Sequence, residues 1–264
     1  MPATPVATFS GFFGKIPSHG DFIKYNMPRS FIDPWDDWMQ TSMSRMQQDL
    51  GNDWLGLYLT SPIYRFALTP GICGEESRIG LIIPSVDRVG RYYPLTLSAS
   101  IGENTNPFCN FTEQEVWFQF AEELALSALE DGISFSELAE QAFLLDEKLL
   151  SVDELSLPEF EACEKLPDTL LIRKSLASIG DSSTLYLALL DTVLKEACHA
   201  YSLWWTSGSE AIDGSFLVSQ GLPVSSSMAA FLDGQWSQWG WLSDNPQPQP
   251  LLSDYMDDPE PWDN

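Results

Sequence analysis

The stretch from Pro84 to Leu95 constrains the possible folds of this chain more than any other. It places two arginines, an aspartate and a serine between two apolar runs, Ile79–Ile83 and Leu95–Ala99. Apolar runs of this length, bounded by proline and glycine, are typical of β-strands. The polar residues therefore belong to the connection between two strands of one sheet. Such connections often carry binding residues, although an ion-paired structural turn accounts equally well for the same residues.

Strands and helices alternate along the rest of the chain. The patterns predict strands at residues 8–15, 64–68, 79–84, 93–101, 202–206 and 215–218. They predict helices from 33 to about 51, from 112, from 134, over 185–201 and over 226–232. This order predicts a single α/β domain in which helices sandwich a mixed, largely antiparallel sheet.

Two of the helix starts depend on particular residues. Asp33-Pro34 combines a capping residue with a proline suited to the first helical position. The segment Thr112–Glu115 has the form of a capping box. After Asp33, apolar side chains from Trp35 to Met46 recur every three or four residues, as on a helix that packs against a core.

The negative charge is concentrated after residue 100. The formal net charge is −25, and residues 1–100 carry eight basic and nine acidic residues, so the remainder carries −24. Repulsion excludes nucleic acid and anionic membranes as ligands of that part. Residues 151–183 are predicted to be a connector. Residues 243–264 are acidic without a single base, and they are predicted to form a flexible tail behind a domain that spans residues 1–242.

Compartment and cofactor follow from what the sequence lacks. The start of the chain does not resemble a secretory signal, and no apolar run is long enough to cross a bilayer, so we expect a cytoplasmic protein. Four widely spaced cysteines without a C-x-x-C pair favour reduced thiols. The only histidines are His19 and His199, which argues against a zinc site. No metal site or cofactor is expected.

An enzyme remains the alternative interpretation. Gly11–Lys15 contains a Gly-Lys pair after a strand, but it is too short for a phosphate-binding loop and lacks the following hydroxyl residue. A hydrolase or nucleotide-binding enzyme would have to use the loops Lys15–Asp21 and Ser85–Arg91. Its candidate residues are Lys15, His19, Asp21, Ser85 and Asp87. Only geometry can test such a constellation.

The pair Trp204-Trp205 lies in a predicted strand, where neighbouring side chains point to opposite faces of the sheet. One tryptophan should therefore lie in the core. The other is either covered by a second helix layer or forms an aromatic patch on the surface.

Several of these segments together resemble the TagF/ImpM family of type VI secretion-associated proteins. The resemblance is carried by Gly11–Phe22, which is similar to the family's opening G-x-x-GK-x-P-x-x-GDF signature, and by Pro84–Leu95, its most distinctive run. Further matching segments are Trp35–Trp38, Trp54 with Tyr58, Pro62–Phe66, Ser202–Thr206 and Gly221–Pro223. The family often has arginine where His19 stands, so a strict role for that side chain is not expected.

The resemblance implies a non-catalytic cytoplasmic accessory protein that represses type VI secretion after translation. It implies a forkhead-associated scaffold protein of the secretion system as partner, and neither a catalytic residue nor a cofactor.

The expected site is a polar cluster that either binds the partner or stabilises the fold. Its residues are Lys15, Ser18, Asp21, Ser85, Asp87, Arg88 and Arg91. We expect the lysine-bearing loop and the arginine-bearing loop to converge on one side of the sheet.

Overall fold

A seven-stranded sheet organises the molecule, and every strand in it runs antiparallel to its neighbours. The computed structural model describes residues 9–102, 105–130, 132–150 and 182–242. Residues 151–181 of the predicted connector and the predicted tail lie outside the described residues, and the last two connector positions, 182 and 183, belong to a helix. Across the sheet the order is β2 (Ile23–Tyr25), β1 (Phe9–Gly14), β5 (Leu95–Ser100), β4 (Arg78–Ile83), β3 (Tyr64–Leu68), β6 (Tyr201–Thr206) and β7 (Ser215–Gln220).

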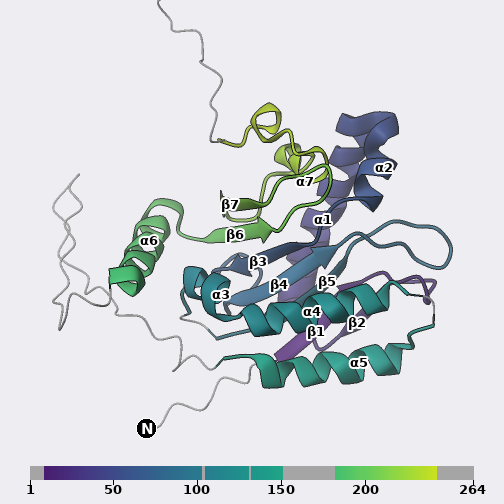
Figure 1. Cartoon of the computed structure of the whole chain (residues 1–264), viewed down its shortest axis with the longest axis horizontal. Helices are drawn as coiled ribbons and strands as arrows, with labels where there is room; N and C mark the ends of the chain where they lie inside the picture. Colours follow the sequence, from purple (N-terminus) through teal and green to yellow (C-terminus); the bar gives the residue numbers. More distant parts are fainter. Residues whose placement is uncertain (1–8, 103–104, 131, 151–181, 243–264) are drawn as a thin grey trace, which may run out of the picture.

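Helices cover both faces of the sheet (Figure 1). One face packs against α3 (Pro107–Glu113), α4 (Glu115–Ala128), α5 (Phe135–Leu144) and α6 (Ser182–Cys198). The other packs against α1 (Arg29–Leu50), α2 (Trp54–Leu59) and α7 (Ala230–Asp233). Among the described residues, short 3₁₀ turns occur at Gly51–Asp53, Leu145–Lys148, Ser225–Ser227 and Trp236–Trp239. The predicted α/β architecture is confirmed.

Alternation along the strands produces the two cores. In β5, Leu95, Leu97 and Ala99 point into the core beneath α4. Thr96 points to the other face, where its hydroxyl accepts a hydrogen bond of 3.0 Å from the indole of Trp35 on α1. Because both faces are covered, every residue of β5 is buried, as expected for a central strand.

The tryptophan pair on β6 belongs to both cores. Trp204 packs with Trp35 and Phe66 on the α1 face, and Trp205 packs with Phe111 and Phe118 on the opposite face. Both side chains are buried. Of the two alternatives for the second tryptophan, the covering helix layer is confirmed and the aromatic surface patch of Trp204 and Trp205 is wrong, because helices cover both sides of this strand.

Two helix starts differ from the sequence prediction. Helix α1 begins at Arg29, four residues before Asp33, and Pro34 lies inside it. The burial of Phe31 and Ile32 stabilises this additional turn of the helix. The segment at 112–115 is not a capping box, since Thr112 lies within α3 and its hydroxyl donates to the carbonyls of Phe108 and Cys109.

The predicted start at Ser134 is confirmed. Ser134 caps α5, and its side chain and that of Glu137 form the reciprocal hydrogen bonds of a capping box. The hairpin predicted after residue 202 is also confirmed as β6 and β7. Of the predicted helix at 226–232, the structure retains a 3₁₀ turn at 225–227 and the four-residue α7.

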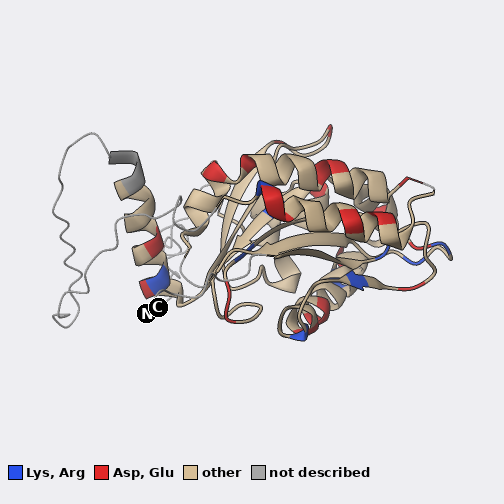
Figure 2. Ribbon diagram, turned by 90° about the horizontal axis from the view of Figure 1, so that it is seen from below, with Lys and Arg blue, Asp and Glu red and all other residues tan. Residues whose placement is uncertain are grey.

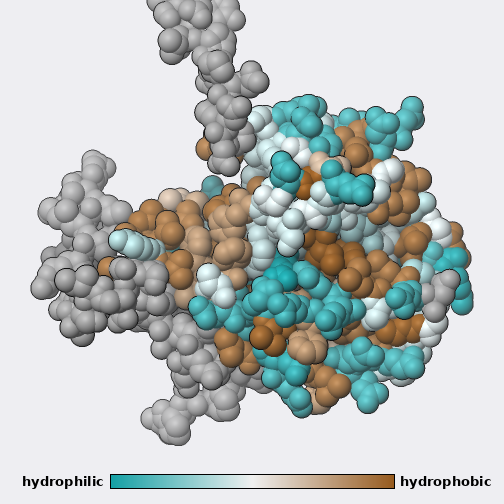
Figure 3. Space-filling model, in the orientation of Figure 1, coloured by the Kyte–Doolittle hydropathy of each residue, from teal (hydrophilic) through white to brown (hydrophobic). Residues whose placement is uncertain are grey.

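The surface differs between the helices. Hydrophilic and hydrophobic residues are interleaved over α4 and α5, whereas hydrophobic residues predominate over α6, where Tyr186 and Leu190 are exposed (Figure 3). Within the described ranges, no helix combines the length and the apolar character needed to span a bilayer.

Candidate partner-binding site

Two loops emerge side by side from one end of the sheet. The first, Lys15–Phe22, follows β1, and the second, Pro84–Pro94, joins β4 to β5. Strands β1 and β5 are antiparallel neighbours, with Phe13 opposite Thr96, so the end of one meets the beginning of the other. Figure 1 shows both loops at the same end of the sheet. The expected convergence of the two loops is confirmed.

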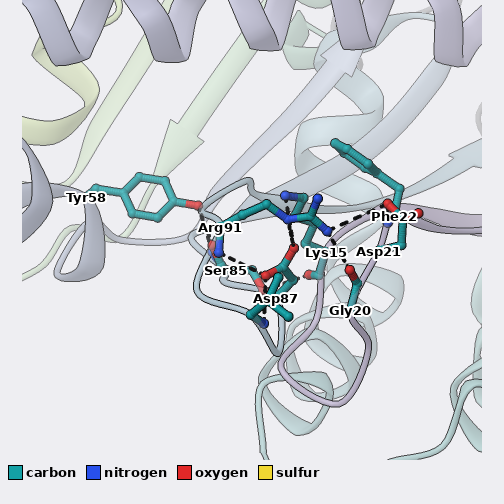
Figure 4. Close-up of polar contacts among 9 residues, drawn as sticks. Lys15, Gly20, Asp21, Phe22, Tyr58, Ser85, Asp87 and Arg91 are labelled. Atoms are coloured by element: carbon teal, nitrogen blue, oxygen red, sulfur yellow. Dashed lines mark hydrogen bonds and ion pairs between the residues drawn. The ribbon is translucent and has the colours of Figure 1, made fainter.

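Asp87 is the centre of the contacts between the loops (Figure 4). One carboxylate oxygen, Oδ2, lies 3.2 Å from Nζ of Lys15 and 2.7 Å from Nε of Arg91. The other, Oδ1, accepts hydrogen bonds from the backbone N–H groups of Val89 and Arg91 at 3.0 and 2.9 Å. The Asp87 side chain is fully buried and Lys15 nearly so, whereas Arg91 is 55% exposed.

The environment of Asp87 favours its charged form. Burial by itself would raise the pKa of this carboxyl group. Hydrogen bonds from the backbone and guanidinium of Arg91, from the ammonium of Lys15 and from the backbone of Val89 outweigh it, and they hold the pKa of Asp87 well below its ordinary range. The carboxylate is therefore ionised at any physiological pH and forms ion pairs with Lys15 and Arg91.

Tyr58 and Ser85 fix the base of the second loop. The Tyr58 hydroxyl accepts a hydrogen bond from the backbone N–H of Ser85 and donates one to its carbonyl, both at 2.9 Å. Burial raises the pKa of Tyr58, so this hydroxyl stays protonated. The Ser85 hydroxyl donates to the carbonyl of Lys15 at 2.7 Å. A residue from α2 thus anchors the second loop, which in turn holds the first.

The tips of the loops are joined as well. The backbone N–H of Arg88 donates to the carbonyl of His19 at 2.9 Å, and the guanidinium of Arg91 donates to the carbonyl of Gly20. The Arg88 side chain lies beside Gly20, since a Cβ on Gly20 would be in van der Waals contact with its Nη2 at 3.4 Å. Asp21 stands 3.9 Å from the Arg91 guanidinium and is highly exposed.

An exposed aromatic ring borders the cluster. Phe22 packs against Phe13 and Tyr93, with ring centroids 5.5 and 4.7 Å apart, and its own face lies 5.0 Å from the Lys15 ammonium. Such a cation–π contact further stabilises the buried ammonium of Lys15. Phe22 is still 42% exposed.

We call the exposed side chains above the buried cluster the loop face. It consists of Asp21, Phe22, Arg88, Val89 and Arg91. Val89, at the tip, is 65% exposed. Among the described residues, the guanidinium of Arg88 has no hydrogen bond or ion pair. The loop face therefore offers a free cation, a second half-exposed cation, an aromatic edge and an apolar tip on a rigid base.

The residues named for the enzyme alternative do not form a catalytic constellation. The hydroxyl of Ser85 donates to a main-chain carbonyl, and the ring of His19 pairs with the hydroxyl of Ser18 at 3.0 Å. The ammonium of Lys15 points into the cluster and pairs with Asp87, so it is not presented to a phosphate ligand. No group of three or more potential metal ligands occurs in the part of the chain that the structure describes.

The structure unites most of the predicted cluster. Side-chain contacts join five of the seven residues into one network, namely Lys15, Asp21, Ser85, Asp87 and Arg91. Arg88 is tied to the first loop only through its backbone N–H, which donates to the carbonyl of His19. Ser18 stands apart and pairs with His19. Tyr58, Phe22 and Val89 were missed as site residues. Tyr58 carries no local signal because it comes from a helix 27 positions before its partner.

Both loops fall within the part of the chain that matches a known family. The family model described as the TagF N-terminal domain, type VI secretion system-associated, matches residues 11–144. This chain belongs to that family. The matched span contains Lys15, Tyr58, Asp87 and Arg91, so the whole buried cluster lies inside the domain of this TagF-family chain.

A solved structure extends the likeness beyond that span. The crystal structure of PA0076 from Pseudomonas aeruginosa PAO1 shares 33% sequence identity with this TagF-family chain and has a TM-score of 0.69. The match covers 86% of this chain and 94% of that one. No curated protein matches the chain significantly.

Proposed function

We propose that this chain is a non-catalytic cytoplasmic regulator that represses type VI secretion after translation. It does so by binding a forkhead-associated scaffold protein of the secretion system through the loop face. Family membership supports the association with type VI secretion. The choice of surface rests on one observation: the buried Asp87 holds both loops in a single arrangement before any partner arrives.

A preformed surface suits this role because little conformational entropy is lost on binding. Arginine and an aromatic ring are residue types that contribute strongly to protein interfaces. The backbone N–H of Arg88 donates a hydrogen bond to the carbonyl of His19, and the guanidinium remains available to a partner at the surface. Basic residues are rare in this chain, and Figure 2 shows several of them in the loops at this end. An acidic segment of the partner is therefore the complementary ligand.

No observation favours the hydrolase or nucleotide-binding alternative. Its serine, histidine and lysine are each engaged in a different contact, and a phosphate ligand would have to displace Asp87 from Lys15. We therefore assign the polar loops to docking and to the stability of the docking surface.

The substitution Arg88→Glu tests the proposal. It reverses a charge whose side chain has no role in the network, so the thermal unfolding midpoint should stay unchanged. Binding to the purified scaffold protein, measured by calorimetry, should weaken about tenfold or more. In cells, overproduction of the variant should fail to lower type VI secretion, while overproduction of the wild-type chain does.

Arg29→Glu is the matched control, because Arg29 is an exposed arginine at the start of α1 and the charge change is identical. This control should bind the scaffold protein like the wild type. Equal binding by the Arg88→Glu variant and the wild type would refute the assignment of the surface. Failure of the wild-type chain to bind the scaffold protein at all would refute the partner.

A further inference from the structure

Strand β7 leaves one edge of the sheet without a partner. Within the described part of the chain, β6 is the only element that packs extensively against it, and no other segment forms a backbone hydrogen bond with residues 215–220. Figure 1 shows β7 at the opposite side of the sheet from β2. An edge of six residues presents a row of N–H and C=O groups that can pair with another strand.

The two edges of the sheet are not equally protected. Strand β2 has only three residues, carries an exposed lysine at its centre, and is followed by Asn26 with a φ of 51°. Short length and an exposed lysine are the usual means by which proteins prevent edge pairing. Strand β7, Ser-Phe-Leu-Val-Ser-Gln, contains no charge and no proline. The chain blocks one edge and leaves the other open.

Apolar side chains mark the open edge. Phe216 is 45% exposed and Val218 41% exposed, and both point to the face that carries α3. Phe216 contacts Phe111 of α3, with ring centroids 5.1 Å apart. Both side chains therefore leave apolar surface exposed on the edge strand itself.

We propose that β7 pairs antiparallel with β7 of a second copy of this chain, which joins the two sheets across a two-fold axis at Leu217. A two-fold axis perpendicular to the sheet keeps each side chain on its own face of the sheet. Two residues that lie opposite each other must therefore have side chains on the same face, which means that their residue numbers sum to an even value. Centring on Leu217 places Phe216 opposite Val218 of the second copy and Ser215 opposite Ser219 of the second copy. This register gives two aromatic–β-branched pairs and two serine pairs, which are favourable across strands.

The same register separates the acidic residues. Asp213, just before β7, falls opposite Gly221 of the second copy, so no carboxylates face each other along the strand. This matters because each copy carries a net charge of −25 and the two molecules repel each other at long range. A neutral, nearly palindromic strand is thus the surface that a second copy fits.

Analytical ultracentrifugation of the full chain tests the pairing. We expect a concentration-dependent monomer–dimer equilibrium, and the substitution Val218→Lys should weaken the dimer about tenfold or more, because it places a charge in both apolar pairs. The matched control is Leu126→Lys on α4, where another exposed aliphatic residue receives the same charge. It should dimerise like the wild type.

A single cysteine tests the register. Under mild oxidation, Leu217→Cys should form an intermolecular disulfide, because the residue lies opposite its own copy at a Cα distance of about 5 Å. Ser219→Cys should not, because its two copies would be offset by four residues, roughly 13 Å along the strand. Circular dichroism confirms that each variant is folded before its result is interpreted.

Three outcomes would overturn the proposal. One is a monomer at every concentration up to about 1 mM. Another is a dimer that Val218→Lys leaves intact or that crosslinks equally well through residues 217 and 219. The third is a dimer that appears only after residues 243–264 are removed, since the acidic tail would then be the occupant of the edge.

Discussion

A single carboxylate holds the site together at the scale of residues. Asp87 is fully buried, and it neutralises one buried and one half-exposed cation. A second buried cation, Arg78, shows the contrast. Burial lowers its pKa to about 10, and its guanidinium lies 4.7 Å from the ring of Phe31. Its polar contacts are long: a hydrogen bond of 3.4 Å to Ser98 and an ion pair of 3.8 Å with the carboxylate of Glu76. The counter-ion of Lys15 is fully buried at 3.2 Å, whereas the counter-ion of Arg78 is one-third exposed and lies farther away, at 3.8 Å.

Replacement of Asp87 by asparagine should destabilise the fold. The amide has no charge with which to balance Lys15, and its NH₂ group would face other donors, so a buried cation is left uncompensated. We expect the thermal midpoint at pH 7 to fall by about 5 °C or more. Thermal unfolding followed by circular dichroism measures it. Asp21→Asn, at an exposed position, is the control and should unfold like the wild type.

The pH dependence of this difference identifies its origin. The folded-state pKa of Asp87 lies below the ordinary aspartate value, so the unfolded chain takes up the proton first on acidification. The stability difference between wild type and Asp87→Asn should be constant above about pH 5 and shrink below about pH 4. A difference that persists unchanged to pH 3 would show that geometry, and not charge, causes the loss.

At the scale of elements, burial decided where α1 begins. Local chemistry pointed to Asp33-Pro34, but the structure places Pro34 at the sixth helical position. There its missing N–H leaves the carbonyl of Ser30 without the usual i→i−4 donor. The helix tolerates this defect because Phe31 and Ile32, which precede it, are buried against the sheet.

Pro34→Ala distinguishes the two possible starts. If α1 runs through residue 34, alanine restores a hydrogen bond and should raise the free energy of unfolding by about 1–3 kcal/mol. If the helix began at Asp33, proline would occupy its preferred first position, and alanine would be neutral or slightly destabilising. Urea unfolding measures the change, and a lower midpoint for the variant would contradict the observed start. The side chain is exposed, so packing contributes little.

At the scale of the whole molecule, charge is distributed unevenly. Acidic residues occur along several helices, whereas several of the few basic residues lie in the loops at one end (Figure 2). The formal net charge of −25 means that the compact state repels itself. Salt screens the buried pair of Lys15 and Asp87 much less than it screens the surface charges.

Added salt should therefore stabilise this protein. Between about 20 mM and 500 mM sodium chloride, screening weakens the repulsion between surface acids more than it weakens the buried cluster. We expect the thermal midpoint to rise by several degrees. A midpoint that falls with salt would show that surface ion pairs, such as Arg65 with Glu115, outweigh the net charge.

Local patterns were sufficient to predict which segments are strands and which loops carry the polar residues. The strands at 64–68, 202–206 and 215–218 were predicted within one or two residues of their observed bounds. Short apolar runs between glycine, proline and serine rarely form anything other than a strand. The convergence of the two polar loops was also predictable, because both adjoin strands of the same sheet.

Only the tertiary structure decided the order of the strands and the partners within the site. Strand β6 pairs with β3 across more than 130 residues, and Tyr58 reaches the backbone of Ser85 from a separate helix. Such contacts form where two distant segments bury their apolar surfaces against each other, and the spacing of residues along the chain carries no information about which segments do so. For the same reason, whether Trp204 and Trp205 were core or surface depended on helices that approach from distant parts of the sequence.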